Sequence, residues 1–149
     1  MSNILAIYDA LAALPLTFDG QPLPVYLPDD LPSAIHSAHL PARLLLSGRS
    51  AVQSMTPLTM SGARTAVLWL VTDLFLNAPI AQGRAVGDAA AALARYESAY
   101  LSTLRPRLAL TPNAVITQVL AQAGTFAYPD GSSTRFSGVE ARLLVREVT

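Results

Sequence analysis

The chain has 149 residues, no cysteine and a formal net charge of zero, with ten arginines, ten acidic residues and no lysine. This composition excludes disulfides and thiolate metal sites, and it argues against a protein that grips nucleic-acid phosphates, because such proteins carry a basic excess. The N-terminus lacks the features of a signal peptide, and no apolar run reaches the roughly 18 residues that span a membrane. We therefore expect one soluble domain, residues 1–149, made in a cytoplasm.

Charged residues make up only 13% of the chain, whereas about 25% is usual for a soluble domain. Two interpretations remain open: partners cover part of the surface, or the domain is simply small and well packed. The absence of lysine fits either interfacial arginine pairing or codon bias in a GC-rich genome.

The first predicted element is a helix over residues 3–14, with Ser2 as its N-cap and Pro15 at its end. Apolar residues recur there at spacings of three and four, which gives one face that can pack on a sheet. A proline-rich arm follows over 16–41, and it is either functional or partner-bound, or else a loosely attached surface arm. It contains His36 and His39, which no third ligand completes as a metal site, so we expect bonded or solvated histidines.

Residues 42–47 predict a strand, and Gly48 opens a long loop over 48–64 that leads into the next strand as a long antiparallel hairpin. The loop contains Met55 and Met60, and methionine adapts to irregular contacts. We expect this loop to act as an arm that packs on another subunit; the alternative is that it folds back on its own domain.

Residues 65–76 are apolar on both alternate sets, which predicts a central strand that must be covered on both faces. Asp73 alone interrupts it. Such a residue is either a buried functional carboxylate or, more commonly, lies at a sheet edge or pairs with an arginine.

The second half of the chain predicts a helix over 89–105 and a terminal hairpin of two strands, 114–128 and 134–148. Pro129 and Gly131 mark the turn between these strands. The fold class is therefore α+β, with a mixed or antiparallel sheet, two helices packed on one face and a long terminal β-hairpin.

No group of residues matches catalytic, cofactor-binding or metal-binding machinery. The carboxylates are scattered, and no nucleophile motif is present. We expect that the protein is not an enzyme and has no cofactor.

Three stretches resemble the tail terminator proteins of long-tailed, lambda-like bacteriophages. They are residues 73–79 (Asp-Leu-Phe-Leu-Asn-Ala-Pro), residues 116–124 (Ile-Thr-Gln-Val-Leu-Ala-Gln-Ala-Gly) and the hairpin that ends in 143–147 (Leu-Leu-Val-Arg-Glu). The resemblance covers roughly residues 42–149 and rests on element order and loop placement. The proline-rich segment 16–41 departs from the family pattern, which leaves another neck, head-closure or tail-tube protein as the alternative.

The resemblance implies a structural virion protein: a homo-hexameric ring, assembled in the host cytoplasm, that caps the tail tube at its head-proximal end. Its partners would be the tail tube protein and a head-completion or neck protein, and DNA would pass through the lumen without specific binding. The candidate interface residues lie in the 48–64 loop and the 128–135 turn: Arg49, Val52, Met55, Leu58, Met60, Arg64, Asp130 and Arg135. An alternative of another class is a small-molecule-binding α+β domain.

Overall fold

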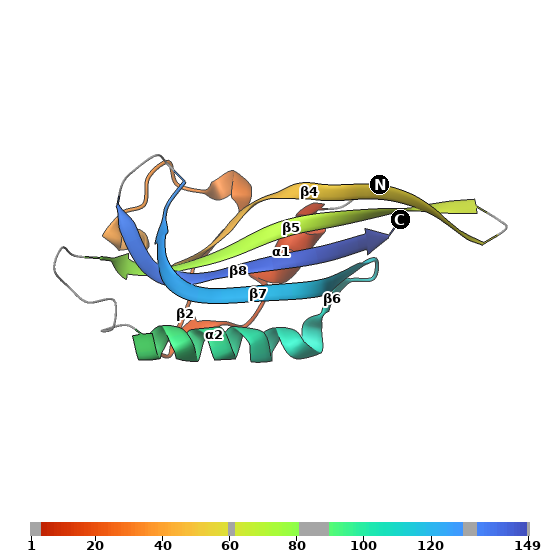
Figure 1. Ribbon diagram of the computed structural model, residues 1–149. Helices are drawn as coiled ribbons and strands as arrows, with labels where there is room; N and C mark the ends of the chain where they lie inside the picture. The colour runs from red at the N-terminus through yellow and green to blue at the C-terminus, as the bar shows by residue number, and fades with distance from the viewer. Residues whose placement is uncertain (1–3, 60–61, 81–89, 130–133, 149) are drawn as a thin grey trace.

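The architecture is a long, twisted six-stranded sheet with helices on one side (Figure 1). It is seen in a computed structural model that describes residues 4–59, 62–80, 90–129 and 134–148. The strand order is β3-β4-β5-β8-β7-β6; β3 and β4 are parallel, and all other neighbours are antiparallel. The strands are β3 (Val25–Tyr26), β4 (Ala42–Thr59), β5 (Gly62–Pro79), β6 (Ala109–Thr111), β7 (Ala114–Ala127) and β8 (Arg135–Val148).

Two α-helices, α1 (Ile4–Ala12) and α2 (Ala90–Leu104), pack on the same face of the sheet. Leu11 of α1 and Leu93 of α2 join Val71 and Phe75 of β5 in one buried cluster. The α+β class, the two helices on one face and the terminal hairpin are therefore confirmed. The remaining elements are β1 (Thr17–Phe18), β2 (Gln21–Pro22) and the 3-10 turns η1 (Pro28–Asp30), η2 (Ser37–His39) and η4 (Arg105–Arg107).

The prediction of a loop over 48–64 is wrong. The described residues of this stretch continue β4 as far as Thr59 and begin β5 at Gly62, and the two strands pair with each other. Three register shifts along this pair absorb the glycine and proline residues that suggest a loop in the sequence. The next strand, β8, pairs with β5 only as far as Ala66, so the end of the hairpin is a two-stranded ribbon that projects from the sheet (Figure 1).

The proline-rich segment is divided between the two faces of the sheet: Leu16 and Phe18 join the core beneath the helices, and the later part packs against the second face at one end. Leu74 and Leu76 of β5 are buried there with Tyr128 and Phe136, and residues from 26 to 40 pack around them. The Tyr128 hydroxyl donates a hydrogen bond to the carbonyl of Pro32, which holds the segment in place. This part of the chain is therefore bound to its own domain rather than loosely attached.

The two histidines are hydrogen-bonded to each other, which is the bonded rather than the solvated alternative expected from the sequence. The amide of His36 donates to Nδ1 of His39 over 2.9 Å, and the rings stack 5.5 Å apart. Within the described ranges, no three potential metal ligands gather at one place. Among the same residues, no helix has the length and apolar character needed to cross a membrane.

Candidate functional site: the edges and open face of the sheet

The most polar buried group of the described residues is built around Asp73. Its carboxylate accepts hydrogen bonds from Arg43, at 2.5 and 3.3 Å, and from the Tyr100 hydroxyl at 2.8 Å. Arg43 also donates to the carbonyl of Leu11 at the end of α1 over 2.9 Å. This network connects β4, β5 and both helices, and the arginine-paired alternative for Asp73 is confirmed.

Burial controls the protonation of the groups in this network. Desolvation, reinforced by the negative charge of Asp73, raises the pKa of Tyr96 and of Tyr100 well above the usual value for tyrosine. Desolvation alone would lower the pKa of Arg43, but the attraction and hydrogen bonds of Asp73 outweigh it, so that pKa is raised. Both tyrosines stay neutral and Arg43 stays charged at ordinary pH, which suits a structural clamp rather than a proton-transfer site.

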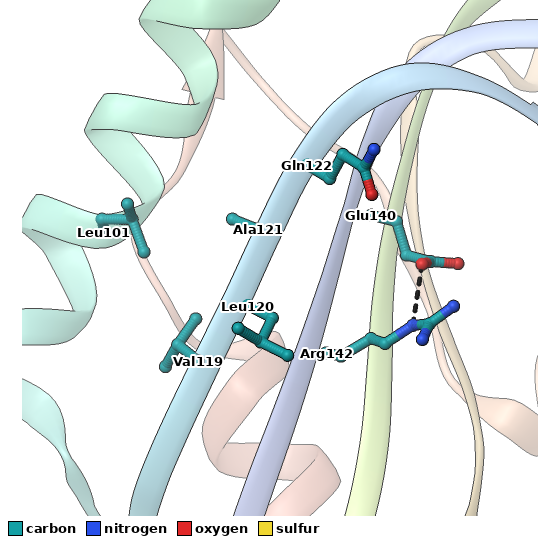
Figure 2. Close-up of a pocket in the computed structure, with 7 residues that line it drawn as sticks. All are labelled: Leu101, Val119, Leu120, Ala121, Gln122, Glu140 and Arg142. Atoms are coloured by element: carbon teal, nitrogen blue, oxygen red, sulfur yellow. Dashed lines mark hydrogen bonds and ion pairs between the residues drawn. The ribbon is translucent and has the colours of Figure 1, made fainter.

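The outer edge of β7 carries an open pocket of about 540 Å³ (Figure 2). Among the described residues, β6 pairs with β7 only at Ala114 and Val115, so the edge beyond has no partner strand. Leu101 of α2 and Val119 line the pocket from the helix side, and Leu120 lines it from the opposite face. An unpaired edge with apolar residues on both sides is the arrangement that receives an added strand.

The other edge of the sheet is open in the same way. β3 pairs with β4 at Arg43 and Leu44, and no described strand pairs with that edge of β4 further along. The two unpaired edges therefore lie on opposite sides of the sheet (Figure 1).

Among the described residues, those that cover the sheet face opposite the helices belong mainly to the later part of the proline-rich segment, from 26 to 40. Beyond it, Leu70 and Leu120 are exposed, the latter to 58%. Arg142 lies directly across from Leu120 in the register and forms a surface ion pair with Glu140 at 2.9 Å. The exposed leucines and this ion pair together make the open part of this face a mixed apolar and charged surface.

A second groove, of about 460 Å³, lies between α1 and η1 beside the β4 edge. Its apolar lining includes Leu5 and Trp69, and its acidic residues are Asp9, Asp29 and Asp30. These residues are distant in sequence, so no local pattern marks them as one surface; the only sequence signal is the adjacent pair of aspartates.

The predicted interface residues fall in three groups. Five of them lie on the stretches of β4 and β5 that pair with each other: Arg49, Val52, Met55, Leu58 and Arg64. Arg135 begins β8 and donates to the carbonyl of Thr125 over 2.7 Å, which ties it to β7. Met60 and Asp130 are outside the described residues.

Comparison with protein-family models and with curated proteins finds no match for this sequence.

Proposed function

We propose that this chain is a tail terminator of a long-tailed bacteriophage, a subunit of a ring that caps the tail tube and joins it to the neck proteins. The observation that carries the proposal is a pair of strand edges, on opposite sides of one sheet, that have no partner strand among the described residues over most of their length. Two different edges on one subunit permit head-to-tail contacts, and such contacts close into a ring when the rotation between copies is right.

The chemistry of the chain supports the same role. Exposed strand edges and apolar sheet faces are a liability for a free monomer, and natural proteins normally block or cover them. Here β7, Leu70 and Leu120 remain open, which is expected of a subunit that is covered on assembly. The net charge of zero suits a lumen through which DNA passes without being held.

The test is the tail-length distribution, by negative-stain microscopy, of particles made without this gene. Abnormally long, headless tubes are the expected result, because nothing would stop tube polymerisation. Tails of normal length that fail to join heads would assign the protein to head–tail joining instead. Normal, infectious particles would contradict any role in the assembly pathway and favour a small-molecule-binding domain.

The ribbon at the end of β4 and β5 provides a second test of assembly. A two-stranded ribbon alone is marginally stable in water and contributes little to the domain core. Replacing residues 55–65, the stretch beyond the last β5–β8 pair, by an Asn-Gly turn should leave a folded monomer, seen by circular dichroism, that no longer assembles. Normal assembly of that variant would show that the ribbon is not an assembly arm.

A further inference from the structure

The groove between α1 and η1 combines exposed apolar surface with uncompensated negative charge. Leu5 is 62% exposed, and Trp69 donates its indole N–H to Glu147, so its ring is fixed in the wall of the groove. Asp9, Asp29 and Asp30 are all exposed, and among the described residues none of them forms an ion pair. The groove therefore suits an occupant with apolar and basic side chains side by side.

The end of α2 presents that chemistry. Leu101 is 38% and Leu108 is 41% exposed, and between them lie Arg105 and Arg107, both exposed. Arg107, in η4, donates to the carbonyl of Thr103 in the preceding helix α2. Within the described part of the chain neither arginine pairs with a carboxylate. We refer to residues 101–108 as the α2 end patch.

The groove opens between α1 and residues 27–30 at the β4 edge, and α1 also contacts β6, which follows the α2 end patch at the other edge of the sheet. Residues 27–30 of the groove follow β3 directly, and η1 packs against β4. In the patch, Leu101 lines the pocket at the β7 edge, and the carbonyl of Leu108 accepts a hydrogen bond from the amide of Ile116 in β7. Contact between the β4 edge of one copy and the β7 edge of the next would therefore bring Asp29 and Asp30 of the first towards Arg105 and Arg107 of the second.

We infer that the acidic groove receives the α2 end patch of a second copy of this chain, and that this contact sets the head-to-tail order of subunits. The inference rests on the proposed ring and names the surfaces that join its subunits. Asp29 and Asp30 face Arg105 and Arg107, while Leu5 and Trp69 cover Leu101 and Leu108. A contact of this kind is directional, because neither surface is complementary to itself.

The absence of cysteine permits a direct test by disulfide crosslinking of full-length protein. One chain carries Asp30→Cys, the other carries Arg105→Cys, and the two are mixed and oxidised. A covalent dimer should form in the mixture and not in either sample alone, whereas Gln21→Cys, at an exposed position on β2, should give none with Arg105→Cys. A dimer of Asp30→Cys with itself, or none in the mixture, would overturn the inference.

Charge reversal provides a second test, read by sedimentation velocity. The Asp29→Arg, Asp30→Arg variant and the Arg105→Glu, Arg107→Glu variant should each lose at least about tenfold in self-association, because like charges would then meet. An equal mixture should recover assembly, since each reversed surface meets its opposite on the other variant, and this recovery also shows that both variants are folded. A variant with Arg95→Glu and Glu97→Arg, which exchanges two charges of α2 outside the groove, the α2 end patch and the β7-edge pocket, is the matched control.

The outcomes separate the inference from the proposed function. Wild-type protein that associates, together with reversal variants that associate equally well, would overturn the contact and leave the ring. Wild-type protein that stays monomeric at every concentration, with normal tails in its absence, would contradict both.

Discussion

On the helix-covered face of the sheet, β5 presents Val71, Asp73 and Phe75, and all three are buried beneath α1 and α2. On the opposite face the same strand presents Leu70 and Leu74, of which Leu74 is buried and Leu70 is exposed. The sequence is equally apolar on both sides, so the difference lies in what covers each face. The covered face stabilises the monomer, whereas the uncovered stretch of the other face exposes Leu70 to solvent.

The largest expected effect comes from Asp73→Ala on the covered face. This change leaves the buried charge of Arg43 without its partner, and we expect the free energy of unfolding to fall by about 3–5 kcal/mol. Urea unfolding measures the loss. The matched control is Glu140→Ala, which breaks the exposed pair with Arg142 and should cost at most about 1 kcal/mol. Similar losses for the two variants would contradict the contrast between the faces.

Gly138→Ala tests the close approach of β8 to β5. A Cβ at this position would lie 3.1 Å from the carbonyl carbon of Phe75 and closer still to its oxygen, so the backbones must separate. We expect a loss of about 2–3 kcal/mol, measured by urea unfolding. Gly124→Ala is the control, because its Cβ would meet only the ring of Phe126 at 3.7 Å and should change stability by less than about 1 kcal/mol. An unchanged free energy of unfolding in Gly138→Ala would show that the strands can separate without loss of stability.

The two buried tyrosines of α2 should respond differently to removal of the hydroxyl. The Tyr100 hydroxyl donates to Asp73, and its loss in Tyr100→Phe should cost about 1.5–3 kcal/mol, as for other hydrogen bonds to charged groups. The Tyr96 hydroxyl is buried with no hydrogen-bond partner among the described residues, so Tyr96→Phe should be neutral or stabilising. Thermal unfolding of both variants measures the two effects. A larger loss of stability in Tyr96→Phe than in Tyr100→Phe would show that the Tyr96 hydroxyl is the one that stabilises the fold.

High pH should weaken the covered face through the same two residues. The pKa of each is raised in the folded state, so the unfolded chain releases these protons first, near pH 10, and stability then falls as pH rises. Each tyrosine should contribute a slope on the order of 1.4 kcal/mol per pH unit above that point. Urea unfolding between pH 8 and pH 11 should show a flatter decline for the Tyr96→Phe, Tyr100→Phe double variant. An unchanged slope would mean that both hydroxyls ionise freely in the folded protein.

The regular spacing of apolar residues predicted the helices and strands that bury one face and expose the other. Helix α1 spans Ile4–Ala12 against a prediction of 3–14, and β8 spans Arg135–Val148 against 134–148. These segments succeed because a single repeated spacing, near 3.6 or 2 residues, determines which side chains are buried. The ribbon was missed because bulges in β4 allow glycine and proline within a strand, and they disturb the alternation that marks one.

Contacts between distant segments had no comparable signal. Arg43, the partner of Asp73, is 30 residues away and lies in a short apolar stretch without any distinctive pattern. The acidic groove likewise combines residues of α1, residues 27–30 and Trp69, which only tertiary packing brings together. Local sequence patterns could therefore indicate that surfaces remain to be covered, but they could not locate them.

The smallest effect on the monomer, and the sharpest test of the open face, is expected for Leu120→Glu. Leu120 is exposed, and a carboxylate there lies across from Arg142, so the free energy of unfolding should change by less than about 1 kcal/mol. Assembly should be lost, because the charge would be buried against the next subunit at the β7 edge. Sedimentation velocity measures assembly and urea unfolding measures stability, with Ser98→Glu, at an exposed position on α2, as the control. If Leu120→Glu still assembled, the open face would be solvent-exposed in the ring, and the contacts between subunits would have to lie on the helix side of the sheet.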